Sequence, residues 1–289
     1  MTTQPPTIGL FAVNMYASAS PGGPARVAAL AEKLGYDSVW AGEHVVLPSP
    51  RVEPSPMDPE DPSLDPIIAL TQAATVTEKV RLGTGIIILP QRNPVVLAKQ
   101  LASLDVLSRG RLIFGMGVGY LEPELRAIGV PVGERIDMSM EYLGAMRSLW
   151  YDERPSYNGT FVDFADIDAH PRPVQRPIPV IMGGQTAGAH RRSVADADGW
   201  YGFNLGRSGT ERQLASIATK MKKAGRERPL EISITPPMPL TPELVLDYAE
   251  LGVHRLIVMP PGHLPPDEVD VFIEANAPDR IGATPAPWF

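Results

Sequence analysis

The chain has 289 residues, and 44% of them are hydrophobic, which is enough to bury a large core. Its net charge of −7 argues against nucleic acid or an anionic membrane surface as the main partner. The absence of cysteine excludes disulfides, thiolate metal sites and cysteine nucleophiles.

The N-terminal residues and the apolar runs carry no targeting or membrane signal. Residues 1–6 are polar and rich in proline, without the basic and apolar regions of a signal peptide. The longest apolar runs are far shorter than the roughly 20 residues that a membrane-spanning helix needs. We therefore expect a cytoplasmic protein that is not bound to a membrane.

Strands and helices are expected to alternate along the chain. Strands are predicted at residues 7–15, 37–46, 80–89, 111–114, 178–182, 199–203, 230–235 and 255–259. Helices are predicted at residues 25–34, 66–77, 95–107, 122–128, 134–150, 187–197, 209–223, 242–251 and 266–275. Eight strands that alternate with helices are typical of an α/β fold of the (β/α)8 TIM-barrel type. No linker divides two cores, so we expect one domain over residues 1–289.

The repeating unit is most complete between residues 79 and 120. Residues 80–89 are mostly apolar, which is typical of a strand buried on both faces. Residues 95–107 place apolar side chains at helical spacing, and Gly110 can take the left-handed conformation that ends a helix. Residues 111–114 then begin a second strand. Two parallel strands joined by a helix imply a right-handed crossover.

Two stretches interrupt the alternation. Residues 47–64 contain six prolines, and a loop of this length inside a compact domain is usually functional, often as a lid. Residues 157–174 alternate aromatic, polar and proline residues, which indicates an inserted hairpin. We expect both stretches to cover a site at the mouth of the barrel.

Two groups of glycines follow predicted strands, at the barrel end where ligands bind. Residues 115–119 read Gly-Met-Gly-Val-Gly, which lacks the G-x-G-x-x-G spacing of a Rossmann site. These glycines fit either a flat ring lying against the backbone or simply tight packing at the barrel mouth. Gly183 and Gly184 precede a helix, where backbone N–H groups bind phosphate or merely form a strand–helix turn.

Glu43 and His44 end the second predicted strand, and Tyr120 ends the fourth. A histidine there can transfer a proton, bind a metal or serve only in packing. The five histidines, at positions 44, 170, 190, 254 and 263, show no ligand spacing, so we expect no metal. No G-x-S-x-G or H-E-x-x-H motif is present.

Several motifs recur together in one known superfamily. They are Gly35-Tyr-Asp-Ser-Val-Trp40 with Glu43-His44, Leu82-Gly-Thr-Gly-Ile86, Arg92-Asn-Pro94, the run from Leu104 to Arg111, Gly115 to Gly119, Pro171 to Gln175, Gly183-Gly184, and Ala197-Asp-Gly-Trp200. With them the chain resembles the luciferase-like monooxygenase superfamily, specifically its coenzyme F420-dependent oxidoreductase branch. The resemblance extends from residue 8 to about residue 275.

The resemblance implies a hydride transfer between the deazaflavin F420 and a small organic substrate. It implies a non-prolyl cis peptide at Gly85-Ile86 behind the central ring, and catalytic roles for His44, Tyr120 and Glu43. The residues that it implies around the coenzyme are Glu43, His44, Thr84, Gly85, Ile86, Gly117, Gly119, Tyr120, Met182, Gly183 and Gly184. Members of the branch are commonly dimers, so we expect a homodimer.

The chain departs from the sugar-phosphate dehydrogenases of this branch. Tyr120 stands where they have a glutamate, with Glu122 two residues further on, and Pro48 stands where they have a tryptophan. These departures indicate a different substrate. Three alternatives stay open: an FMN-dependent monooxygenase of the same fold, a cofactor-free hydrolase or lyase that pairs Glu43 with Glu122, and a non-catalytic flavin- or deazaflavin-binding relative.

Overall fold

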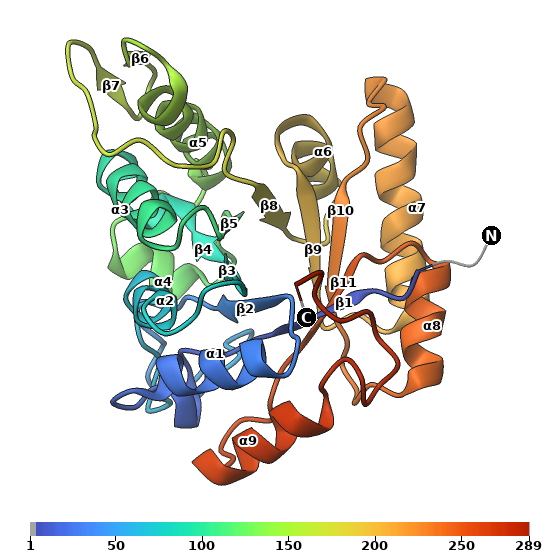
Figure 1. Cartoon of the computed structure of the whole chain (residues 1–289). Helices are drawn as coiled ribbons and strands as arrows, with labels where there is room; N and C mark the ends of the chain where they lie inside the picture. The colour runs from blue at the N-terminus through green and yellow to red at the C-terminus, as the bar shows by residue number, and fades with distance from the viewer. Residues whose placement is uncertain (1–3, 289) are drawn as a thin grey trace.

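The computed structural model describes residues 4–288, which form a closed barrel of parallel strands surrounded by helices (Figure 1). The barrel strands are β1 (Thr7–Leu10), β2 (Ser38–Ala41), β3 (Arg81–Thr84), β5 (Leu112–Gly117), β8 (Val180–Gly183), β9 (Gly199–Phe203), β10 (Glu231–Thr235) and β11 (Arg255–Val258). Neighbouring strands pair in parallel, and the pairing of β3 with β5 closes the ring. The predicted (β/α)8 barrel is confirmed.

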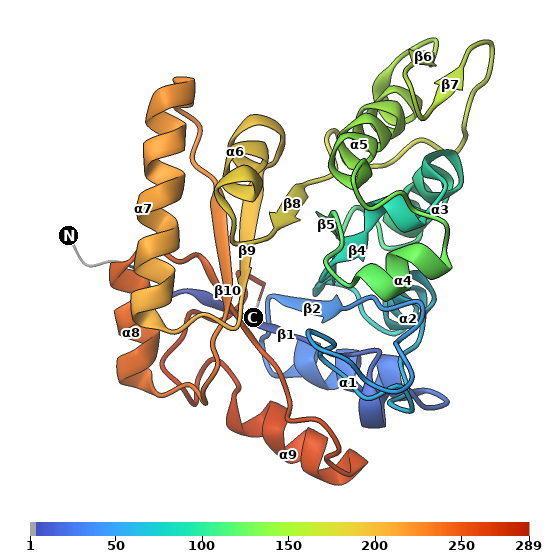
Figure 2. The same ribbon diagram turned by 180° about the vertical axis from the view of Figure 1, so that it is seen from behind.

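The view from behind shows the helices on the outside of the strands (Figure 2). They are α1 (Gly23–Lys33), α2 (Pro66–Ala74), α3 (Pro94–Leu107), α4 (Glu122–Ala127), α5 (Arg135–Tyr151), α6 (Ala187–Asp196), α7 (Arg207–Ala224), α8 (Pro242–Glu250) and α9 (Pro266–Ala275). Side-chain caps start several of them: Asp65 accepts hydrogen bonds from the first backbone N–H groups of α2, and Asn93 does so for α3. None of these helices is long and apolar enough to cross a membrane.

Three predicted strands are shorter than expected. β1 ends at Leu10 rather than residue 15, because Ala12 takes a positive φ of 62° that breaks the extended chain. β2 ends at Ala41 rather than residue 46, because the following backbone N–H groups bond to side chains instead of a neighbouring strand. The predicted strand 80–89 is divided into β3 and the short β4 (Ile87–Ile88) by the cis peptide at Gly85-Ile86, which confirms that prediction.

The inserted segment forms a hairpin only in its first half. β6 (Tyr157–Asn158) and β7 (Asp163–Phe164) pair in antiparallel orientation, and residues 165–174 form no strand. The carboxylate of Glu141 on α5 accepts hydrogen bonds from backbone N–H groups of the hairpin turn. The hairpin therefore packs against α5, and Phe161 of its turn also packs on the cluster that contains Ile88 of β4 and Leu125 of α4.

The N-terminal end of the barrel is held by buried charges. Arg255 is 3% exposed, and its guanidinium donates hydrogen bonds to the carboxylates of Asp37 and Glu231. It also lies 5.6 Å from the ring centroid of Trp40. A cavity of about 350 Å³ opens at this end, and His254 is among the residues that line it. Groups at this face of a barrel usually serve stability, whereas catalytic groups follow the other ends of the strands.

Candidate active site

The glycines of β5 and β8 make room for the side chain of Ile86. A Cβ atom on Gly117 would collide with Cδ1 of Ile86, and one on Gly183 would lie 3.1 Å from the same atom. The buried hydroxyl of Thr84 donates a hydrogen bond to the carbonyl of Gly115 at 2.7 Å, which joins β3 to β5 beside this residue. The apolar surface at the mouth is therefore the half-buried Ile86 rather than bare glycine backbone.

Glu43 is buried and both of its oxygens are engaged. One oxygen accepts a hydrogen bond from the backbone N–H of Ile88 at 2.6 Å, and the other accepts from Nε of Arg92 at 2.7 Å. Arg92 also pairs with Asp65 at 2.6 Å. Burial raises the pKa of Glu43, although the charge of Arg92 opposes this effect. Glu43 thus holds β4 and the turn after it, and does not face Glu122 as the hydrolase alternative requires.

His44 lies between a buried carboxylate and a tyrosine. Its Nδ1 is 2.9 Å from Oε2 of Glu124, and its Nε2 is 3.5 Å from the hydroxyl oxygen of Tyr120. The imidazole is 9% exposed, and its ring meets that of Tyr120 edge to face with centroids 6.0 Å apart. Burial raises the pKa of Tyr120, and the nearby charge of Glu124 adds to this shift. The three side chains form a continuous polar path from the protein interior to the half-exposed tyrosine.

Glu124 is the functional candidate that the sequence-based prediction missed. That prediction pointed to Glu122, which is exposed and pairs with Arg126 one turn further along α4. Glu124 lies between the fully buried Leu121 and Leu125, so it occupies the inward face of the helix. A signal was present in the sequence, because Glu124 interrupts an apolar face at helical spacing.

The turn after β8 leads into α6, whose first turn lies beside two arginines. Gly184 has a φ of 112°, a conformation that side chains disfavour, and Thr186 caps α6 two residues later. Arg191 and Arg192 lie beside Gly188 in the first turn of that helix. Burial and the charges of Arg191 and of Arg135 on α5 lower the pKa of Arg192, and the charge of Asp137 only partly opposes this shift. An anion at this turn would relieve that repulsion.

The remaining predicted residues of this region contribute backbone more than side chain. Arg135 donates a hydrogen bond through Nε to the carbonyl of Gly119 at 3.2 Å, which ties the end of β5 to α5. Gly119 itself has a φ of 78°. The side chain of Met182 is 4% exposed and packs in the main core, so it does not face the mouth.

The proline-rich loop 47–64 lies over the barrel mouth. Its residues Leu47 and Met57 pack in one cluster with Phe11 and Tyr201, and Met57 is only 4% exposed. The amide of the buried Asn14 anchors the loop end by donating to the carbonyl of Leu64 at 2.6 Å. This loop therefore has the position expected of a lid.

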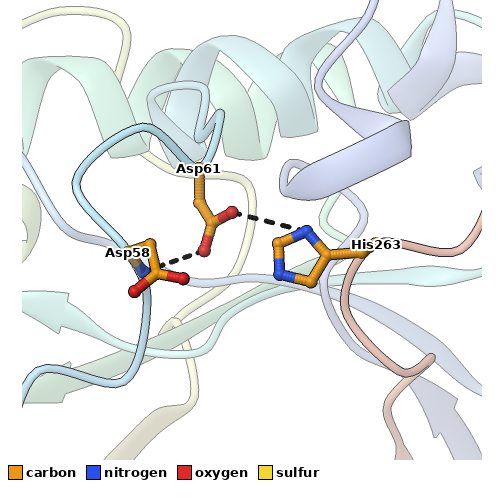
Figure 3. A group of neighbouring side chains, drawn as sticks. All are labelled: Asp58, Asp61 and His263. Carbon is orange, nitrogen blue, oxygen red and sulfur yellow. Dashed lines mark hydrogen bonds and ion pairs between the residues drawn. The ribbon is translucent and has the colours of Figure 1, made fainter.

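The loop is also tied to the segment that precedes α9. Asp61 accepts a hydrogen bond from the backbone N–H of Asp58 at 2.9 Å and pairs with Nδ1 of His263 at 3.6 Å (Figure 3). The ring of His263 also meets that of Tyr16 edge to face. Ligand atoms of these two aspartates and the histidine lie within 4.8 Å of one another, but Asp58 and His263 are exposed and Asp61 already bonds to both residues. We interpret the group as an anchor for the loop.

Comparison with known proteins identifies relatives with two kinds of coenzyme. The chain is 33% identical to an uncharacterized protein of Mycobacterium tuberculosis over 265 residues, which are 88% of this chain and 92% of the relative. It is 32% identical over 185 residues to an F420-dependent glucose-6-phosphate dehydrogenase of Kineococcus radiotolerans, covering 63% of this chain and 52% of that protein. It is 34% identical over 154 residues to an FMNH2-dependent dimethylsulfone monooxygenase of Pseudomonas putida, covering 52% and 42%.

Solved structures share the fold. Monooxygenase RslO1 from Streptomyces bottropensis superimposes with a TM-score of 0.76 at 22% identity, over 94% of this chain and 97% of that one. An F420-dependent secondary alcohol dehydrogenase superimposes with a TM-score of 0.73 at 18% identity, over 95% and 98%. The family model described as luciferase-like monooxygenase matches residues 9–244. With the closed barrel and the motifs at its mouth, this match shows that the chain belongs to the luciferase-like monooxygenase family.

Proposed function

We propose that the chain is an oxidoreductase that binds coenzyme F420 at the C-terminal mouth of its barrel, where His44 transfers a proton to or from a small organic substrate. The observation that carries the proposal is the placement of His44, which is held from behind by Glu124 and directs Nε2 toward Tyr120. An imidazole exchanges protons readily near neutral pH, and hydride transfer at an oxygen-bearing carbon requires such an exchange.

The residues at the mouth fit a flat coenzyme with an anionic tail. Ile86 offers an apolar surface between the ends of β5 and β8, and Arg191 and Arg192 lie beside the first turn of α6, which follows Gly183-Gly184, with the charge of Arg135 nearby. These groups would hold the ring and the phosphate, and F420 would supply a carbon that gives or accepts hydride. The loop 47–64 would exclude water from the bound complex. The identity to an F420-dependent dehydrogenase over 185 residues supports this choice of coenzyme.

Glu43 would position the neighbouring backbone and would not itself take part in the reaction. Its engagement with Ile88 and Arg92 fixes β4 immediately after Ile86, so it positions the surface on which the ring would lie. The ion pair with Arg92 and the hydrogen bond from Ile88 hold this buried carboxylate in one orientation behind β4. The proposal therefore assigns the proton transfer to His44 and Tyr120.

An FMN-dependent monooxygenase is the second candidate. The 34% identity to an FMNH2-dependent monooxygenase over 154 residues favours it. The mouth geometry is compatible with either coenzyme, because both present a planar ring and a phosphate.

Titration of the purified chain with F420 and with FMN separates the candidates. Trp40 is buried inside the barrel, 5.8 Å from the ring of Tyr201, and a ring bound at the mouth should quench its emission. We expect F420 to bind at least tenfold more tightly than FMN, a difference of about 1.4 kcal/mol. Tighter binding of FMN, or a yellow chromophore that remains through purification, would support the monooxygenase. Failure of both to bind would contradict the proposal.

A further inference from the structure

Glu124 is a buried carboxylate whose charge is compensated mainly by hydrogen bonds. Its side chain has no solvent exposure. Oε2 lies 2.9 Å from Nδ1 of His44, and Oε1 accepts a hydrogen bond from the backbone N–H of Val45 at 2.6 Å. Within residues 4–288, no arginine or lysine forms an ion pair with this carboxylate. Such a group is costly to bury unless each oxygen keeps its donor.

The chemistry of the two groups decides where the proton of His44 lies. An ionised carboxylate can only accept hydrogen bonds, so the nitrogen that faces Glu124 must carry a hydrogen. A neutral imidazole has one N–H, and the proton therefore lies on Nδ1 and leaves the lone pair on Nε2. A free histidine side chain prefers the opposite tautomer, with its proton on Nε2. The protein environment thus reverses the intrinsic preference.

We infer that Glu124 is a positioning residue that fixes the Nδ1–H tautomer of His44 and thereby makes Nε2 the proton acceptor at the barrel mouth. The inference deepens the proposed function, and its value for catalysis rests on that function. The backbone N–H of Val45 fixes the orientation of the Glu124 carboxylate, because it donates a hydrogen bond to the second oxygen. Nε2 then faces the hydroxyl of Tyr120, the more exposed end of the path.

A glutamine at position 124 should reverse the tautomer of His44 rather than merely reduce the preference for the Nδ1–H form. The amide oxygen of Glu124→Gln can take the hydrogen bond from Val45 N–H, which turns the NH2 group toward Nδ1 of His44. Nδ1 must then accept, so the ring proton moves to Nε2. The variant keeps the shape of the side chain and removes its charge.

The test is nitrogen-15 NMR of histidine rings in the whole chain without coenzyme or substrate, at a pH well above 6.5. A His44→Asn variant assigns the His44 signals. In the parent we expect the Nδ1–H form to exceed the Nε2–H form by at least about tenfold, since a hydrogen bond to a charged group stabilises by more than that ratio requires. In Glu124→Gln we expect the ratio to invert.

Glu122→Gln is the matched control. It removes the same charge from the same turn of α4, but Glu122 is exposed and pairs with Arg126. We expect this variant to keep the tautomer of the parent. The exposed His170, whose Nε2 lies 3.1 Å from Oδ2 of Asp168, provides a reference in which a carboxylate faces the other ring nitrogen.

Two results would overturn the inference: a parent in which Nε2–H predominates at His44, or a Glu124→Gln variant that retains Nδ1–H. If that variant does not fold, the parent spectrum alone decides. Because the measurement needs no coenzyme, it is independent of the proposed function. Failure of F420 to bind would contradict the proposed function and leave the tautomer result standing.

Discussion

His44 is the single side chain on which the proposed chemistry depends most. If it transfers a proton, His44→Ala should lower turnover by about 100-fold or more and change the dissociation constant of F420 by less than about threefold. The alanine removes the acceptor at Nε2 but leaves Ile86 and the arginines beside the turn in place. Steady-state kinetics and fluorescence titration measure the two quantities. His170→Ala, an exposed change outside the barrel, is the control.

The opposite pattern would give His44 another role. Weaker F420 binding with turnover restored at saturating coenzyme would mean that His44 only contacts the coenzyme. No change in either quantity would place His44 outside the site.

Gly184 tests the binding of the phosphate. An aspartate there adds a negative charge where the phosphate is expected, but φ is 112° and a Cβ would lie 2.9 Å from Cβ of Ala189, so any side chain also strains the turn. Gly184→Ala reproduces the strain without the charge. We expect Gly184→Asp to bind F420 at least tenfold more weakly than Gly184→Ala, a difference of about 1.4 kcal/mol. Equal affinities in titrations of the two folded variants would remove this turn from the site.

The sequence predicts the position of single residues where a strand end carries them, but not the partners that they contact. His44 and Tyr120 were predicted at the mouth because parallel strands end there together. Glu43 was predicted to be catalytic, but it is engaged by Arg92. Glu124 was missed because its role depends on a contact with a residue 80 positions away.

Among the elements, α6 carries a buried histidine that links stability to pH. His190 is 1% exposed, its Nδ1 lies 3.0 Å from the hydroxyl of Ser216 on α7, and its ring packs against Trp200 of β9. Burial lowers the pKa of His190, and the charge of Lys220 adds to this shift. In the unfolded chain His190 binds a proton near pH 6.5, whereas in the folded chain it binds one only at lower pH.

The direction of the pH effect follows from this difference. The stabilising contribution of neutral His190 is complete above pH 6.5 and is lost as the pH falls toward the lowered pKa of the folded state. Between pH 6.5 and 5.5 this group should lower the free energy of unfolding by up to about 1 kcal/mol, because half of the unfolded chains already carry the proton at pH 6.5. His190→Phe should remove that share of the pH dependence in urea denaturation, and His170→Gln should not. An equally steep pH dependence in His190→Phe would contradict the assignment.

Element positions were predicted closely where apolar patterns determine them and less closely near the site. The strand at residues 199–203 and the helix at residues 266–275 coincide with β9 and α9. β1 and β2 end early, because the residues after them bond to side chains and loops at the mouth. Such bonds come from distant parts of the chain, so no local pattern reveals them.

For the whole molecule, the alternation of strands and helices was sufficient to predict the barrel, but nothing in that pattern states the oligomeric state. We propose a homodimer through α2 and α3, which lie side by side and expose apolar residues. Ile68 is 69% exposed and Val96 is 56% exposed. Light scattering should give a mass of about 63 kDa, twice the 31.3 kDa of one chain.

The variants Ile68→Glu and Val96→Glu should shift this mass toward that of the monomer, because they place charge in the proposed contact. Leu246→Glu on α8, where the leucine is 52% exposed, is the matched control and should leave the dimer intact. A parent that is monomeric at all concentrations would contradict the proposal.

The most direct test of the central claim, that a deazaflavin binds at the C-terminal mouth beside His44, is a histidine-ring NMR titration with F420. The barrel provides its own control, because His254 precedes β11 and lines the cavity of about 350 Å³ at the opposite end. Our account predicts that F420 shifts the ring signals of His44 and leaves those of His254 unchanged. Shifts at His254 without shifts at His44, or no shift at either ring under saturating F420, would contradict it.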